Sequence, residues 1–420
     1  MHMAALCFMA MATAPWLAAC SIGGDDDRQQ QPLQPAAPAD TTETAAPDTL
    51  ALPDTPPGAA GEARITDTVK WATAPALTNL NFVYPSTDPY GQPVMLSGTI
   101  SMGGDVVRDR QGSGMALYSH YTVCRANECP TEGKLDVPQL LQRLAPDGRL
   151  IVVSPDYYGF GATADKLQAY CIGTANAQAT VDALIAARQL LSAQGYTWPE
   201  DHLFNIGYSQ GAQTAMAVLR LTTERYPSLR FACTMAGGGP YDMAATYSRF
   251  IETGTAGMPS TVVNVLLAYN EYYRLGLPYS SLFVEPTLSH IDEWVLGKRL
   301  ASSTIDRRIG THDVSQIVAS ELLDLASPLS ARLMAVLAKE NLCEGWTPRS
   351  DEHILLVHHE DDATVPVENT LRLSQFMRQQ GVRYVETDVA DYMQWPGADE
   401  HASGAAAFAM RALSWLRSYY

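Results

Sequence analysis

The chain has 420 residues, of which 46% are apolar and 17% are charged, and its net charge is −17. Such an acidic chain lacks the basic surface that nucleic-acid binding requires, so we expect no nucleic-acid partner. The apolar content is too high for a chain that is disordered throughout. A polytopic membrane protein is excluded as well, because the sequence contains no apolar run of about eighteen residues.

The first predicted element is an export signal. Residues 3–19 are mostly apolar and end in Leu-Ala-Ala before Cys20. A run this short is typical of a signal peptide, which we place at residues 1–19. The Leu-Ala-Ala-Cys sequence resembles a bacterial lipobox and implies lipidation of Cys20, although no Lys or Arg precedes the apolar run. Ser21 favours the outer membrane, and an ordinary cleaved signal is the alternative.

The next segment, residues 20–62, has the composition of a disordered tether. It contains eight acidic residues, one basic residue and seven prolines, and no aromatic residue. Like charges repel each other and proline removes backbone donors, so such a segment cannot form a core. We therefore expect a folded part in the cell envelope, held to the membrane only through its lipid anchor. The tether carries a net charge of −7, and the remaining 358 residues carry −10.

Strand-like and helix-like segments alternate from about residue 63 onward, which predicts an α/β fold with a mostly parallel central sheet flanked by helices. Strands are expected at residues 81–84, 94–100, 115–119, 150–153, 202–207, 231–235, 353–358 and 383–389. Helices are expected at residues 137–144, 175–191, 212–224, 370–380 and 403–418. Residues 241–350 show no clear strand and are too many for a loop. The sequence therefore predicts a core of residues 63–240 and 351–420 with an inserted helical cap at 241–350.

The sequence Gly-Tyr-Ser-Gln-Gly at residues 207–211 follows a predicted strand and opens a predicted helix. This is the context of a nucleophile elbow, a turn so tight that a Cβ at Gly207 or Gly211 would collide with its neighbours. The turn exposes the Ser209 hydroxyl at the carboxyl edge of the sheet. The main-chain N–H of Gln210 then lies at a helix N-terminus, where it suits a developing oxyanion.

A serine hydroxyl needs a base that an acid orients, and in this type of fold the acid and then the base follow the serine in the chain. Asp361 and Asp362 come directly after a predicted strand, where an acid reaches the same edge of the sheet. His401 lies between the last predicted strand and the last helix, as the base should. The other downstream histidines lie in the insertion or around the strand that already supplies the acid: His290, His312, His353, His358 and His359.

The second oxyanion donor is expected in the loop of residues 119–122, with Tyr121 as the candidate and plain loop structure as the alternative. Residues 358–362, His-His-Glu-Asp-Asp, contain metal-ligand types. Adjacent side chains leaving a strand point to opposite faces, so they do not readily converge on one ion. We expect neither a metal nor any other cofactor.

Five cysteines follow Cys20: Cys124, Cys129, Cys171, Cys233 and Cys343. An exported chain favours disulfides, so four of them could pair and one stay free. Cys124 and Cys129 are close in sequence and are the candidate bridge. Cys233 lies in an apolar strand-like run and is the candidate for the buried free thiol.

Over residues 70–420 the chain resembles the α/β-hydrolase superfamily, and within it the secretory lipase type with a helical cap after the sixth strand. The resemblance rests on residues 155–163, on the elbow and on residues 362–366, Asp-Ala-Thr-Val-Pro. The last of these favours Asp362 over Asp361 as the acid, and Asp156 is implied to order its loop. Cutinases share the elbow, but they lack a cap and keep acid and base close together, whereas Asp362 and His401 are 39 residues apart here.

This resemblance implies hydrolysis of a small-molecule or lipid ester through an acyl-serine intermediate, with Ser209 as nucleophile, His401 as base and Asp362 orienting the imidazole. The apolar stretches 262–267 and 275–282 would line an acyl pocket or pack the cap's own core. A serine peptidase of the same fold is the alternative hypothesis, and a catalytically silent surface-binding lipoprotein is a third hypothesis. A peptidase would need a cap carboxylate for the substrate's amino terminus, and the candidates are Glu252, Glu271, Glu285, Asp292 and Glu293.

Overall fold

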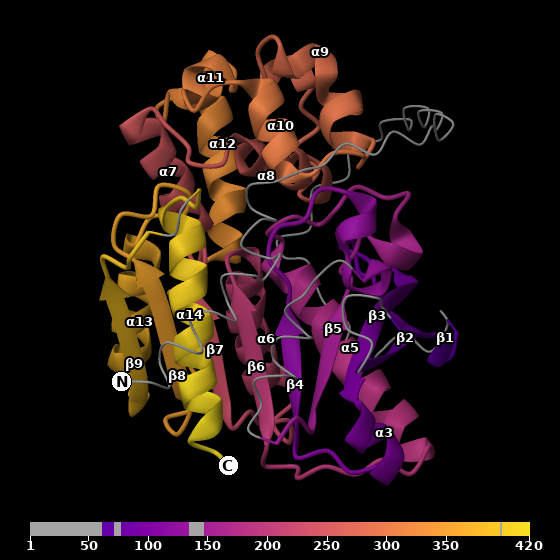
Figure 1. Ribbon diagram of the computed structural model, residues 1–420. Coiled ribbons are helices and arrows are strands. Elements are labelled where there is room, and N and C mark those ends of the chain that lie inside the picture. The colour runs from indigo at the N-terminus through magenta and orange to yellow at the C-terminus, as the bar shows by residue number, and fades with distance from the viewer. Residues whose placement is uncertain (1–60, 71–76, 134–146, 395–396) are drawn as a thin grey trace.

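A single nine-stranded sheet runs through the molecule (Figure 1). The structure is a computed structural model and describes residues 61–70, 77–133, 147–394 and 397–420. The strands lie in the order β1-β2-β3-β5-β4-β6-β7-β8-β9. Their bounds are β1 Arg64–Val69, β2 Leu77–Thr87, β3 Pro93–Gly103, β4 Gly114–Ser119, β5 Leu150–Pro155, β6 Leu203–Tyr208, β7 Cys233–Gly237, β8 His353–His359 and β9 Tyr384–Ala390.

The sheet is antiparallel at one side and parallel over the rest. The strands from β1 to β3 pair antiparallel, as do β3 and β5, and every pairing from β5 to β9 is parallel. All residues of β4, β5, β6 and β7 are buried, which explains why these strands are apolar runs rather than alternating patterns. The expected α/β fold with a mostly parallel central sheet is confirmed.

Helices cover both faces of this sheet. On one face α14 packs through Phe408, Ala412 and Leu416 against side chains of the central strands. The opposite face carries α5, α6 and α13, whose apolar residues belong to the larger core. The bounds of the helices outside the insertion are α3 Gly104–Asp109, α5 Gly173–Ala193, α6 Gln210–Arg225, α13 Glu368–Gln379 and α14 Glu400–Arg417.

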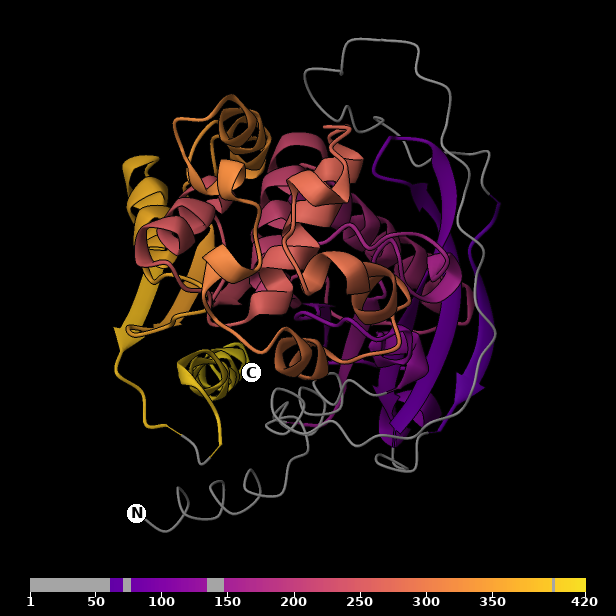
Figure 2. The same cartoon turned by 90° about the horizontal axis from the view of Figure 1, so that it is seen from above.

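Between β7 and β8 the chain forms helices, turns and loops with two isolated β-bridges, Thr255–Asp313 and Phe283–Val318, and it contributes no strand to the sheet. Viewed from above, these helices spread over one end of the sheet (Figure 2). They are α7 Met243–Thr253, α8 Pro259–Tyr272, α9 Thr287–Ile291, α10 Ser302–Ile309, α11 Ser320–Leu323 and α12 Pro328–Leu337. The described residues also form short 3-10 turns, which are η1 Ala126–Glu128, η2 Pro130–Glu132, η3 Gly161–Thr163, η4 Tyr279–Ser281, η6 Val314–Gln316 and η7 Ala338–Glu340. One further turn, η5 Asp292–Leu296, is π-helical.

Buried polar groups join this helical insertion to the sheet and its flanking helices. The ammonium of Lys298 donates hydrogen bonds to the main-chain carbonyls of Gly159, Ala164 and Lys166, and burial lowers the pKa of Lys298 to about 8. The buried carboxylate of Glu340 accepts from the main-chain N–H and the hydroxyl of Thr174, at 3.0 and 2.9 Å. The insertion is therefore hydrogen-bonded to the core at both of these points.

Two elements lack a counterpart in the prediction, namely strand β1 and helix α3. The helix expected at residues 137–144 lies outside the described residues, and so do the signal peptide, Cys20 and most of the tether. Among the residues that the structure does describe, no helix has the length and apolar character needed to cross a membrane.

Candidate active site

The turn between β6 and α6 places Ser209 at the carboxyl edge of the sheet. Its backbone is in a strained conformation, with φ 57° and ψ −125°, and its N–H donates to the carbonyl of Gly237 at 2.8 Å. A Cβ at Gly207 would lie 2.0 Å from the carbonyl oxygen of Gly211, and a Cβ at Gly211 would lie 2.1 Å from that of Ser119. Both flanking glycines are therefore required by backbone that passes too close for a side chain.

Three residues from separate parts of the chain form one hydrogen-bonded row. The Nε2 of His401 lies 2.9 Å from the Oγ of Ser209, and its Nδ1 lies 2.6 Å from Oδ2 of Asp362. Ser209 precedes α6, Asp362 follows β8, and His401 is in the first turn of α14. All three side chains are buried to more than nine-tenths. Asp361, the other acid considered from the sequence, is exposed.

Four hydrogen bonds hold the Asp362 carboxylate. Its Oδ1 accepts from the main-chain N–H groups of Thr364 and Val365, both at 2.8 Å. Its Oδ2 faces His401 and also Nε2 of His358, which lies 3.2 Å away. Burial alone would raise the pKa of Asp362, but the charge of His401 and the two imidazole hydrogen bonds outweigh it and hold that pKa well below its usual range. The carboxylate is therefore ionised at neutral pH.

His358 supports the carboxylate of Asp362, although the sequence located His358 only around the strand that precedes this acid. It is fully buried, and its Nε2 also lies 2.9 Å from the carbonyl of Val365. Its Nδ1 lies 2.7 Å from the Thr370 hydroxyl. The geometry suits a neutral imidazole that donates from Nε2 to the acid loop and accepts from Thr370 at Nδ1. Its spacing of four residues from Asp362 was the available signal, but the direction of the side chain could not be read from it.

His401 is held from the other side by the elbow itself. The hydroxyl of Tyr208 donates to the main-chain carbonyl of His401 at 2.6 Å, and Asp399 caps the helix by accepting from the N–H of Ala402 at 2.8 Å. Burial alone would lower the pKa of His401, but the adjacent Asp362 carboxylate raises it above the ordinary value. The imidazole is thus oriented and is made a stronger base by its neighbour.

The loop after β4 lies against the elbow, because β4 and β6 are neighbours in the sheet. Its His120 is buried, stacks on Tyr157, and has its ring nitrogens 2.7 Å from the carbonyl of Tyr121 and 3.2 Å from that of Asp156. Burial lowers the pKa of His120 to about 4, so the ring is neutral. This places the loop where a second oxyanion donor belongs, while the choice of Tyr121 as that donor stays a prediction.

Asp156 orders its surroundings through hydrogen bonds. Its carboxylate accepts from the hydroxyl of Ser97 at 2.6 Å, and from the N–H and hydroxyl of Thr131 at 2.9 and 2.7 Å. A Cβ at Gly161 would lie 2.1 Å from this carboxylate, which explains the glycine in that loop. The hydrogen bonds of the Asp156 carboxylate go to Ser97 and Thr131, which agrees with a structural role in ordering its loop.

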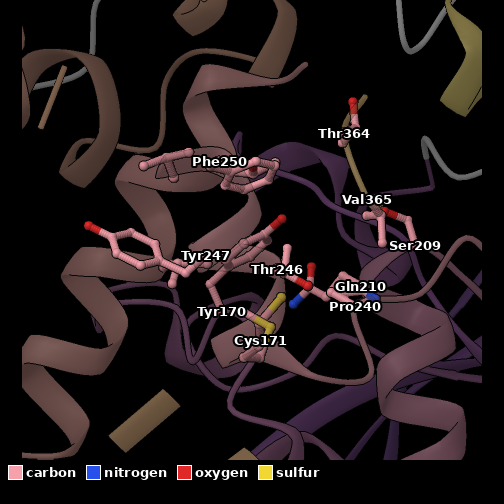
Figure 3. Close-up of a pocket in the computed structure, with 14 residues that line it drawn as sticks. Tyr170, Cys171, Ser209, Gln210, Pro240, Thr246, Tyr247, Phe250, Thr364 and Val365 are labelled. Atoms are coloured by element: carbon pink, nitrogen blue, oxygen red, sulfur yellow. The ribbon is translucent and has the colours of Figure 1, made fainter. Parts of the chain in front are cut away.

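Two cavities adjoin the Ser209–His401 pair. The first is lined by Ser209 and Gln210 together with mostly apolar residues of α7 and α8 (Figure 3). The second is lined by His401, His312 and neighbouring loop residues. His401 does not line the first cavity, and Ser209 does not line the second. The two residues therefore border different cavities.

The proposed bridge between Cys124 and Cys129 is not formed, and all five cysteines of the described part are free thiols. The two side chains belong to different apolar clusters. The Cys124 sulfur lies 3.5 Å from the amide nitrogen of Asn264, and that of Cys129 lies 3.4 Å from the carbonyl of Ala126. The expectation of paired cysteines was wrong because nearness in sequence did not bring the two sulfurs together. Cys233 is buried and free, as expected.

Within the described residues, no group of His, Cys, Asp and Glu side chains is arranged to hold a metal ion. In the 358–362 segment, Asp362 faces His401, and His359 turns instead toward the carbonyl of Tyr392 at 3.1 Å. The five insertion carboxylates weighed for peptide binding are all exposed, and none of them lines the cavity beside Ser209.

The chain is similar to known proteins in sequence and in fold. A family model described as secretory lipase matches residues 138–420. A putative hydrolase from Legionella pneumophila has 19% identity and a TM-score of 0.70, over 82% of this chain and 89% of that one. The rice cell wall degrading esterase LipA from Xanthomonas oryzae has 21% identity and a TM-score of 0.66, over 81% and 89%.

Candida antarctica lipase A has 16% identity and a TM-score of 0.56, over 80% of this chain and 76% of that one. At these identities, the solved structures show a common fold. None of the curated proteins compared with the chain matches it.

Proposed function

The chain belongs to the secretory lipase family and is a hydrolase of the lipase and esterase type, and on that premise we propose that it cleaves carboxylic esters through an acyl intermediate on Ser209. The observation that carries this proposal is the hydrogen-bonded row of Ser209, His401 and Asp362, with distances of 2.9 and 2.6 Å. A serine hydroxyl becomes nucleophilic when a base of this kind accepts its proton.

In the first half-reaction, the Oγ of Ser209 attacks the ester carbonyl while Nε2 of His401 takes the hydroxyl proton. The N–H of Gln210 at the start of α6 stabilises the resulting oxyanion, and Tyr121 is proposed as the residue of the second donor. The bond between the carbonyl carbon and the alkoxy oxygen then breaks, and His401 gives its proton to the leaving alcohol. Asp362 stays ionised and stabilises the imidazolium throughout.

In the second half-reaction, His401 removes a proton from water, whose oxygen attacks the acyl carbon. The bond to Ser209 breaks, the proton returns to Oγ, and the acid leaves. Because His401 protonates the alcohol, the alcohol belongs on the side of the cavity that His401 lines. The acyl group then belongs in the apolar cavity beside Ser209 and Gln210, so the helical insertion acts as a cap that supplies the acyl pocket.

An aminopeptidase-like activity of the same fold receives less support. A substrate with a free ammonium group needs a carboxylate beside the scissile bond, and no acidic residue lines the cavity beside Ser209. The apolar walls of that cavity suit an acyl chain instead. A catalytically silent binding protein would have no need of the Ser209–His401–Asp362 geometry.

The test compares kcat/KM on p-nitrophenyl butyrate with that on aminoacyl p-nitroanilides, for the native chain and for Ser209→Ala. We expect ester turnover that falls by several orders of magnitude in the variant, because the nucleophile is lost. Ester turnover that survives in Ser209→Ala would overturn the mechanism. Turnover of the anilides at a comparable rate would overturn the choice of ester over peptide.

Export agrees with membership of a secretory family. We further propose that Cys20 is lipidated and anchors the chain in the bacterial envelope through the acidic tether. Cys20→Ser should then move the protein from the membrane fraction to the soluble fraction and abolish labelling with radioactive palmitate. A variant that stays in the membrane fraction would contradict the anchor.

A further inference from the structure

The side chain of Gln210 is a buried polar group inside the apolar cavity. Gln210 is the first residue of α6, its side chain lines the cavity, and the residue is 4% exposed. Its Oε1 has no hydrogen-bond partner among the described residues. In Figure 3 the amide extends away from Ser209 toward Thr246. A buried amide oxygen without a partner is costly in a native fold, so the Oε1 of Gln210 indicates a missing hydrogen-bond donor.

Three other hydroxyls that line the cavity already have partners. Those of Thr246 and Thr261 donate to main-chain carbonyls of the preceding turn, at 2.8 and 2.6 Å. The hydroxyl of Tyr170 is paired with that of Thr122 at 2.8 Å. None of these three hydroxyls needs a ligand, whereas the Oε1 of Gln210 has no partner among the described residues.

Gln210 also differs from the other buried glutamines whose Oε1 has no partner, which are Gln168, Gln178 and Gln213. Each of those donates from Nε2 to a neighbour, at distances of 2.8 to 3.0 Å, and none of them lines this cavity. Their amides are fixed within the protein. Gln210 is the one among them that lines the cavity.

The residues that line the cavity indicate the chemistry of the missing partner of Gln210. The cavity is lined by no Lys, Arg, His, Asp or Glu, so it would hold neither a carboxylate nor an ammonium at reasonable cost. A neutral hydroxyl suits an amide, because it can donate to Oε1 or accept from Nε2. We propose that the preferred substrate carries a hydroxyl group on its acyl chain and that Gln210 binds this hydroxyl. This inference rests on the proposed ester hydrolysis.

The expected consequence is a preference for hydroxyacyl esters. A site built to hydrogen-bond a substrate hydroxyl disfavours the analogue that lacks it, because the site's own polar group is then left unpaired. For one neutral amide in a small cavity we expect at least a tenfold difference in kcat/KM, which corresponds to about 1.4 kcal/mol.

The experiment measures kcat/KM by pH-stat titration on two matched sets of esters. The first set is ethyl butyrate and both enantiomers of ethyl 3-hydroxybutyrate, and the second is ethyl hexanoate and ethyl 6-hydroxyhexanoate. In the native chain, at least one hydroxyacyl ester should exceed its parent tenfold. In Gln210→Met, which keeps the size and the main-chain N–H, the same ratio should fall to one or below.

Gln213→Met is the matched control, since it changes the same residue type one helical turn away and outside the cavity. It removes a hydrogen bond to the carbonyl of Cys171, which still accepts from the hydroxyl of Tyr269 at 2.9 Å. The selectivity ratio should be that of the native chain. A native ratio of one or below for every pair, as a bound water would produce, overturns the inference, and so does an unchanged ratio in Gln210→Met. Absence of any Ser209-dependent ester hydrolysis would instead overturn the proposed function.

Discussion

At the scale of single residues, the protonation of the site depends on the contact between Asp362 and His401. The carboxylate of Asp362 raises the pKa of His401, whereas the mechanism that we propose begins from the neutral imidazole. Activity should therefore rise with pH as His401 loses its proton. The sequence placed both residues at the carboxyl edge of the sheet, because each follows a strand that ends at this edge.

Asp362→Asn tests this contact. The amide cannot stabilise the imidazolium and favours the wrong tautomer, so kcat should fall about 10⁴-fold. Because the carboxylate that raised the pKa of His401 is gone, the midpoint of the kcat/KM profile should move to lower pH. Stopped assays with p-nitrophenyl butyrate between pH 5 and 9 measure both effects. A midpoint that stays in place would show that Asp362 does not set the pKa of the base.

His358 is the residue at this scale that the sequence could not assign. A strand residue that follows an apolar run is equally compatible with packing and with a polar contact, and only the fold shows that its ring reaches Asp362. The sequence likewise could not show that the Tyr208 hydroxyl reaches the carbonyl of His401, which lies 193 residues away.

For His358→Phe we expect kcat/KM to fall about tenfold, because one donor to the catalytic carboxylate is lost while the ring still fills its space. With one donor fewer, the carboxylate interacts more strongly with the imidazolium, so the midpoint of the pH profile should rise. The same assays measure this shift, which a loss of packing alone would not produce. An unchanged midpoint of the pH profile would show that His358 acts only through packing.

At the scale of elements, the predictable parts were those with strong apolar patterns. The central parallel strands were located because buried strands are continuous apolar runs. Strand β1 was missed because its sequence, Arg-Ile-Thr-Asp-Thr-Val, has two charged residues and lies mostly exposed at the sheet edge. Helix α3 was missed because six residues give too little periodicity. The Cys124–Cys129 bridge failed because a local spacing does not fix side-chain direction.

The elbow between β6 and α6 supplies a stability test at this scale. In Gly211→Ala the new Cβ would lie 2.1 Å from the carbonyl oxygen of Ser119, so the backbone must shift, and we expect a loss of about 3 kcal/mol or more in unfolding free energy. Gly381→Ala is the control, because nothing lies within 4 Å of its Cβ position and only its left-handed backbone, at φ +85°, costs about 1 kcal/mol.

Urea unfolding followed by circular dichroism measures both variants. Equal losses in the two would show that the close approach of the loop after β4 to the elbow is not a real constraint.

At the scale of the whole molecule, the helical insertion and the sheet form a joint cavity beside Ser209, and Lys298 is one of the groups that hold the two together. The net charge of −17 is unevenly distributed along the chain, because residues 20–62 alone contribute −7. The sequence predicted the insertion from its length and lack of strands. It could not predict the contacts across the boundary, because Lys298 binds main-chain carbonyls that carry no sequence signal, and the spacing of Glu340 and Thr174 does not show that they meet.

Lys298→Met tests this connection. The substitution removes a buried ammonium and leaves the main-chain carbonyls of Gly159, Ala164 and Lys166 without their donor, so the unfolding free energy should fall by about 2 kcal/mol. Lys166→Met is the control, because that side chain is 54% exposed and its ion pair with Asp165 should contribute less than about 1 kcal/mol. Thermal and urea unfolding measure the difference, and equal stability of the two variants would contradict the role of Lys298.

The central claim is that Ser209 forms a covalent intermediate with the substrate's acyl group. Its most direct test is titration of the intact protein with a p-nitrophenyl alkylphosphonate, followed by mass spectrometry of the peptides. We expect that one equivalent of p-nitrophenolate is released per chain, that esterase activity is lost in proportion, and that the adduct is on Ser209. An adduct on another residue, or full activity after one equivalent has reacted, would contradict it.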